Sequence, residues 1–230
     1  EECDQVLEAL GTPVQERYDL LKSHHATAEK RYYPLAQEVI TGTYVGDYDY
    51  VLDLLDRCYF PTREGVANFH DNFVDALILA GEEKIAEGKV EQAVTLYKKA
   101  FTYPENHQVF LVDERATHDA QINYCLGEAY AALGQDAEAE KYWKLAAEQD
   151  YELKGSKDFR YWTGLALERL GRKAEAEAIF SALVADGEAA VVTQHVNFYG
   201  AEGTTGVTVD IINSAAYYTC LLYTSPSPRD

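Results

Sequence analysis

The sequence lacks methionine, has few basic residues and contains no long apolar run, and these absences exclude several classes of protein. Lys and Arg number 20 against 39 Asp and Glu, so that the formal net charge is −19. A nucleic-acid-binding protein needs a basic stripe to neutralise phosphates, and this composition offers none. The same charge disfavours contact with an anionic membrane surface. We therefore expect neither nucleic acid nor membrane among the partners.

Cysteine is also scarce, and its four positions are far apart. Cys3, Cys58, Cys125 and Cys220 include no CxxC pair. This spacing predicts neither a zinc site nor a disulfide framework. Cys125 lies on an apolar helix stripe, where we expect a buried small hydrophobic residue.

No apolar run approaches the roughly 20 residues that span a bilayer, and no signal peptide is present. We therefore expect a cytoplasmic protein. The chain starts at Glu1 and contains no Met, which indicates a fragment without its natural N-terminus. Residues 220–230, CLLYTSPSPRD, resemble a translated sequencing adaptor. We interpret residues 1–219 as native and residues 220–230 as read-through.

The stretch from Gln121 to Val184 contains the same helix–loop–helix unit twice. Apolar residues recur at the three-and-four spacing of one helix face, and a glycine then stops each first helix. The two copies match at a constant offset, since 164 − 127, 171 − 134, 176 − 139 and 180 − 143 all give 37. The matched positions are Gly127 and Gly164, Gly134 and Gly171, Ala139 and Ala176, and Trp143 and Phe180.

These positions resemble the tetratricopeptide repeat, which places small residues where two helices cross and a large aromatic in the gap between them. A third copy has Gly81, Ala93 and Tyr97 at or within one residue of the same positions. The resemblance implies an all-α fold, a right-handed α-solenoid of about five tetratricopeptide-like hairpins over residues 1–219. We expect helix through Val184 and no sheet in the core.

The remaining segments extend this pattern. Helical stripes are predicted over Glu2–Leu10, Gln15–Lys22, Leu35–Ile40, Tyr50–Leu55, Phe69–Glu87, Val90–Phe101 and Thr208–Tyr218. Irregular connections are predicted over Phe60–Gly65, Tyr103–Thr117 and Ala189–Gly206.

The connecting segments carry a second resemblance. The strings LGTP at residues 10–13, HDNFVDA at 70–76 and YPEN at 103–106 are similar to the C-terminal region of a bacterial family. Its members join an N-terminal β-sandwich of unknown function, itself similar to carbohydrate-handling domains, to a tetratricopeptide array. The resemblance implies that this chain is the array without the sandwich.

Several polar groups are candidates for functional sites. His24 and His25 have no helical ligand partner, so we interpret them as a solvated pair. Asp71 or Asn72 is expected to cap the helix that follows. Residues 104–107, PENH, fit a turn after a helix better than the rim of a pocket. No phosphate loop, serine nucleophile motif or HExxH motif occurs, so we expect no catalytic site, no metal and no cofactor.

In tetratricopeptide arrays the first helix of each hairpin lines a concave groove. Counting from the matched glycines predicts nine groove-facing residues that would bind a partner. They are Asp75, Ile78, Glu82, Gln121, Tyr124, Glu128, Asp158, Tyr161 and Glu168. Tyr124 and Tyr161 occupy equivalent positions, which suits either recognition of a peptide or sugar, or packing between neighbouring repeats.

Three functions remain open at this point. The array could be a non-catalytic scaffold whose groove binds a protein, a peptide or the missing N-terminal domain. It could instead be the helical part of a carbohydrate-active enzyme whose catalytic residues lie in that domain, or a structural spacer. Because the chain contains no catalytic motif, the scaffold is the function that we favour.

Overall fold

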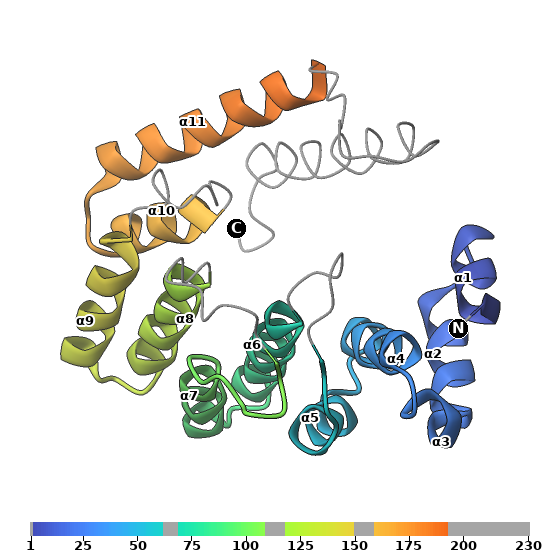
Figure 1. The fold of residues 1–230 in the computed structure, drawn as a ribbon. Helices are drawn as coiled ribbons and strands as arrows, with labels where there is room; N and C mark the ends of the chain where they lie inside the picture. The colour runs from blue at the N-terminus through green and yellow to red at the C-terminus, as the bar shows by residue number, and fades with distance from the viewer. Residues whose placement is uncertain (1, 62–68, 109–117, 150–158, 193–230) are drawn as a thin grey trace.

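The computed structural model describes residues 2–61, 69–108, 118–149 and 159–192 (Figure 1). Asp158, the helix predicted over Thr208–Tyr218 and the adaptor-like residues 220–230 lie outside these ranges. The described ranges contain eleven helices. They are α1 (Glu2–Ala9), α2 (Val14–Ser23), α3 (His25–Ala28), α4 (Tyr32–Val45), α5 (Tyr48–Arg57), α6 (His70–Ala86), α7 (Val90–Lys99), α8 (Asp119–Ala132), α9 (Asp136–Ala147), α10 (Arg160–Arg169) and α11 (Lys173–Val192).

The all-α prediction is confirmed over the described residues. Their one extended pairing is an isolated bridge between Phe60 and His107, and no sheet forms the core. Some boundaries differ, because α4 spans Tyr32–Val45 where Leu35–Ile40 was predicted, and α3 was not predicted. In addition, α11 continues to Val192 where a loop was expected from Ala189. The run Ala-Ala-Val-Val at 189–192 contains no turn residue, so nothing in it ends the helix.

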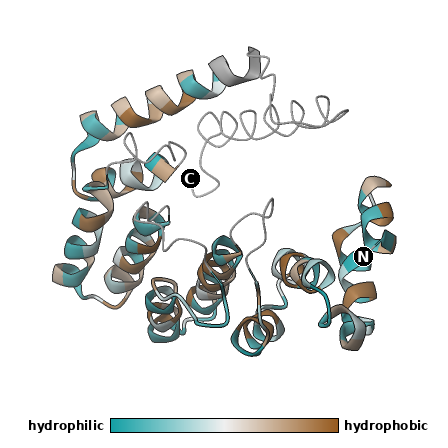
Figure 2. Ribbon diagram, in the orientation of Figure 1, coloured by the Kyte–Doolittle hydropathy of each residue, from teal (hydrophilic) through white to brown (hydrophobic). Residues whose placement is uncertain are grey.

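Helices pack mainly against their neighbours in the sequence. The pairs α6 with α7, α8 with α9, and α10 with α11 are joined by contacts of α7 with α8 and of α9 with α10. The first helices α6, α8 and α10 also touch in succession. The pairs follow one another along an arc (Figure 1). Hydrophobic residues are distributed over all the helices, as expected when each pair is buried by the next (Figure 2).

In three helix pairs, a glycine of the first helix lies directly against an aromatic ring of the second. The contacts are Gly81 with Tyr97, Gly127 with Trp143, and Gly164 with Phe180. A Cβ atom added to any of these glycines would lie 2.2 to 2.4 Å from the nearest ring atom. The predicted pairing of a small residue with a large one is therefore confirmed, and only glycine permits this approach.

The predicted helix stops are also confirmed. Gly134 has φ +70° and Gly171 has φ +76°, in the left-handed region that favours glycine. The Gly134 amide donates to the carbonyl of Ala131 and the Gln135 amide donates to that of Tyr130, both at 2.9 Å. These bonds satisfy carbonyls at the end of α8 and direct the chain back into α9.

At the N-terminal end, α1 and α2 are joined by a buried ion pair. Arg17 donates from Nε to Asp4 at 2.8 Å and from Nη1 to Glu8 at 2.9 Å. A Cβ atom added to Gly42 of α4 would lie 2.9 Å from the Tyr18 ring of α2. The glycine–aromatic contact of the later pairs thus recurs between α2 and α4.

His25 is not the solvated residue that we predicted. Its Nδ1 lies 3.0 Å from Oε2 of Glu38, a fully buried residue. The other carboxylate oxygen of Glu38 accepts a hydrogen bond from the Tyr50 hydroxyl at 2.7 Å. His25 Nε2 lies 3.0 Å from Arg57. Folding places α3 against α4 and α5, so that His25 is half-buried and pairs with Glu38, although sequence spacing alone would leave it in water. His24 remains exposed.

The segment Pro104–His107 makes a structural contact that spans about fifty positions of the chain. The Asn106 side-chain amide donates to the carbonyls of Leu55 at 2.8 Å and Cys58 at 2.6 Å, and His107 Nε2 donates to Leu55 at 2.8 Å. These bonds satisfy carbonyls at the end of α5. The turn was predicted correctly, but its partner helix was not.

Candidate functional site

The predicted groove residues differ widely in exposure. Asp75, Glu82 and Glu168 are exposed, and Gln121, Glu128 and Tyr161 are half-buried. Ile78 and Tyr124 are buried, at 2% and 8% exposure. The eight described members come from α6, α8 and α10, the first helices of their pairs. Ile78 and Tyr124 offer a partner almost no surface, so we exclude both from a contact surface.

The two predicted tyrosines meet at one tryptophan. The Tyr124 ring lies 5.7 Å from that of Trp162, and Tyr161 lies 5.3 Å from Trp162 and 5.9 Å from Phe180. Tyr124 therefore packs from α8 onto α10, which is the packing alternative left open by the sequence. Tyr161 keeps part of its surface accessible.

Glu128 is already engaged by a cation. Arg169 at the end of α10 donates from Nε and Nη2 to its two carboxylate oxygens, at 2.8 and 2.6 Å. This bond raises the Arg169 pKa, against a smaller opposing effect of burial. The pair joins α8 to α10. Sequence reasoning missed Arg169 because it lies outside the matched repeat positions.

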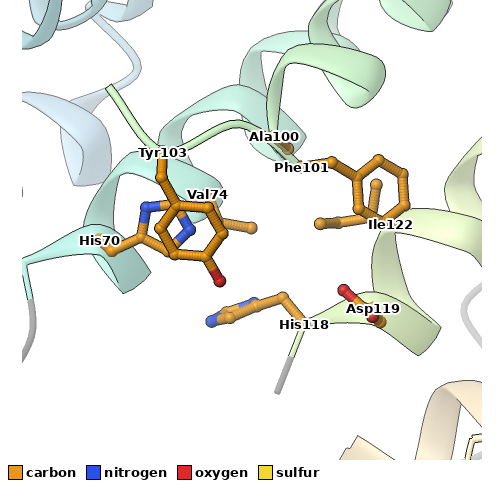
Figure 3. Close-up of a pocket in the computed structure, with 8 residues that line it drawn as sticks. All are labelled: His70, Val74, Ala100, Phe101, Tyr103, His118, Asp119 and Ile122. Atoms are coloured by element: carbon orange, nitrogen blue, oxygen red, sulfur yellow. The ribbon is translucent and has the colours of Figure 1, made fainter. Parts of the chain in front are cut away.

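A small cavity of about 40 Å³ lies between α6, the segment after α7, and the start of α8 (Figure 3). This volume accommodates about three water-sized groups. Its walls combine apolar, aromatic and titratable side chains. They are His70, Val74, Ala100, Phe101, Tyr103, His118, Asp119 and Ile122. None of these was selected from the sequence, because a pocket between three elements has no periodic signal.

His118 connects α8 to α6 at this cavity. Its Nδ1 donates to the Gln121 side-chain oxygen at 3.1 Å, and its Nε2 lies 3.5 Å from Asp71. Burial lowers the His118 pKa, but the bond to Asp71 and the charges of Asp75 and Asp71 outweigh it, so the pKa is raised. Both ring nitrogens face acceptor oxygens, which favours the imidazolium.

Asp71 therefore has a different role from the one that we predicted. The helix α6 begins at His70, and no side chain caps its first amides. Asp71 lies inside the first turn, two positions after the N-cap residue Phe69, and contacts His118 instead. Burial raises the pKa of neighbouring Asp75, although this residue as a whole is exposed.

His70 forms the opposite side of the cavity and remains neutral. Its ring stacks on that of Tyr103 with centroids 4.1 Å apart and planes 15° apart. Burial lowers the His70 pKa to about 4, despite the charge of Asp71. The two imidazoles at this cavity thus have pKa values shifted in opposite directions.

No group of three His, Cys, Asp or Glu side chains in the described ranges is arranged to hold a metal ion. Nor does any helix in the described part of the chain have the length and apolar character needed to cross a membrane.

Comparison with known proteins identifies no family. No protein-family model matches the chain, and no curated protein is similar enough to count as a relative.

Proposed function

We propose that this chain is a tetratricopeptide-like scaffold that binds a protein partner through the first helices of its pairs. The observation that carries the proposal is the glycine–aromatic contact, which recurs in α6 with α7, α8 with α9, and α10 with α11. A unit repeated in this way stacks into a right-handed solenoid, and such arrays present extended binding surfaces.

The surface of these first helices suits a polar or basic partner. Asp75, Glu82 and Glu168 are exposed on α6 and α10, and Tyr161 presents part of an aromatic ring. With a net charge of −19, the chain would attract a basic segment and accelerate its association. Either a peptide or a second domain of the same protein would fulfil this role.

Selection of peptides from a random library against the full 230-residue chain tests the proposal. Glu82→Lys and Glu168→Lys reverse charges on first helices and should weaken the selected peptides about tenfold. Glu91→Lys on α7 and Glu177→Lys on α11 make the same change on exposed positions of second helices and should have little effect. An equal loss of peptide affinity in the first-helix and second-helix variants would contradict a binding surface on the first helices. Hydrolysis of a glycoside by the chain would contradict the scaffold function.

A further inference from the structure

The cavity between α6 and α8 has an aromatic rim and a carboxylate wall. Phe101 and Tyr103 stand at the rim with 37% and 39% of their surfaces exposed. Asp119, the first residue of α8, lines the wall, and Val74 and Ile122 form the apolar floor (Figure 3). Aromatic faces and carboxylates side by side are the surroundings in which proteins bind organic cations.

The balance of charge at the cavity has the sign that a cation requires. Among the described residues, Asp119 is the carboxyl group that lines the cavity, and Asp71 and Asp75 lie near His118 without lining it. The His118 imidazolium is already bonded to Asp71 and Gln121. His70 adds no charge, because it is neutral near pH 7.

We propose that this cavity binds the guanidinium group of an arginine side chain from the partner. A guanidinium has four heavy atoms, which fits a cavity of about 40 Å³ when the group projects partly into the rim. Its plane can stack on the exposed face of Phe101 or Tyr103, and its fork of N–H donors matches the Asp119 carboxylate. The apolar floor accepts the methylene stem.

That the guanidinium belongs to a protein partner rests on the proposed scaffold function. Binding of a guanidinium to the cavity can be tested separately, with a small probe. In an NMR titration of the full ¹⁵N-labelled chain, n-propylguanidinium should shift the amides of Phe101, Tyr103 and Asp119. Butyrate, which has a similar length and the opposite charge, should leave them unchanged. Asp119→Asn should weaken n-propylguanidinium at least about threefold.

A matched variant controls for the loss of a helix-terminal charge. Asp136→Asn makes the same change at the first residue of α9, where the side chain is exposed and distant from the cavity, and should bind like the wild type. If Asp119→Asn does not fold, Phe101→Ala at the exposed rim provides the same test, with a loss of about threefold.

Two outcomes would contradict guanidinium binding at the cavity and leave the proposed scaffold function standing. In the first, n-propylguanidinium causes no shifts at the cavity, or binds equally well to wild type and Asp119→Asn. In the second, library peptides depend on Glu82 and Glu168 but are unaffected by Asp119→Asn and contain no required arginine. Failure of the library to yield any peptide, with intact n-propylguanidinium binding, would instead count against the scaffold.

Discussion

At the scale of single residues, a glycine with no Cβ atom decides how closely two helices approach. In α8 and α10 the space beside Gly127 and Gly164 is filled by a ring from the following helix. Sequence spacing identified both positions, because a small residue and an aromatic recur at one offset. Sequence spacing does not predict the direction in which each ring points.

Gly127→Leu and Gly164→Leu should each lower the free energy of unfolding by more than about 1 kcal/mol, because overpacking a core typically costs about 1 to 3 kcal/mol. A Cβ alone would already lie 2.4 Å from the ring. Denaturant melts monitored by circular dichroism measure the change. Ala132→Leu, at an exposed position of α8, controls for the substitution and should be nearly neutral.

The charge of His118 makes the seam between α6 and α8 depend on pH. Its pKa is raised in the folded protein above the unfolded value of 6.5. The contribution of His118 to stability is therefore fully present below pH 6.5 and is lost as the pH rises through the folded pKa. The difference in unfolding free energy between wild type and His118→Gln should shrink as the pH rises from about 5.5 to 9.

The buried His70 has a lowered pKa, so its effect on stability has the opposite pH dependence and must be separated from that of His118. Its folded pKa of about 4 lies below the unfolded value, so its contribution is lost as the pH falls from 6.5 toward 4. Measuring above pH 6.5 isolates His118. A His118→Gln difference that stays constant with pH, or grows, would show that the imidazolium does not stabilise the seam.

At the scale of elements, the loop that follows α7 is bonded to the end of α5, two helices earlier in the chain. Asn106 and His107 lie after α7, yet they bond to carbonyls at the end of α5. The bridge between Phe60 and this segment adds backbone bonds, from Phe60 to Asn106 at 2.8 Å and from Gln108 to Phe60 at 2.9 Å. The orientation of the α6–α7 pair relative to α5 therefore depends on this loop.

Asn106→Ala should lower the free energy of unfolding by about 1 to 3 kcal/mol, because the Cys58 carbonyl loses its side-chain donor and the Leu55 carbonyl keeps only that of His107. Hydrogen exchange should quicken first at the end of α5. Glu105→Ala removes an exposed neighbour and should change neither quantity. Equal exchange in the two variants would mean that His107 and the backbone bonds to Phe60 hold the loop without the Asn106 side chain.

At the scale of the whole molecule, the dominant quantity is the net charge of −19 on 230 residues. Acidic side chains occur on every described helix except α3, and at this net charge they repel one another in the folded chain. Each ion pair, such as Arg169 with Glu128, uses one charge of each sign, so pairing does not reduce the net charge of −19.

Raising NaCl from about 0.01 to 0.15 M should therefore increase the melting temperature, because the Debye length falls from about 30 to 8 Å and the self-repulsion is screened. Differential scanning fluorimetry at several salt concentrations measures this. KCl should act like NaCl if the effect is screening alone. A melting temperature that falls with salt would indicate that attractive surface pairs outweigh the repulsion.

Local patterning by itself determined the helices, their stops and the small–large contacts, because each depends on residues within one turn or one hairpin. Gly134 and Gly171 end helices in isolation, and a glycine–aromatic pair needs only its own two helices. The tertiary structure alone decided what depends on separate hairpins meeting: the buried His25 network, the loop that caps α5, the pairing of Arg169 with Glu128, and the cavity that His70 and His118 share. In each of these the partners are distant in sequence and share no period, so only the angle at which one helix pair packs on the next brings them together.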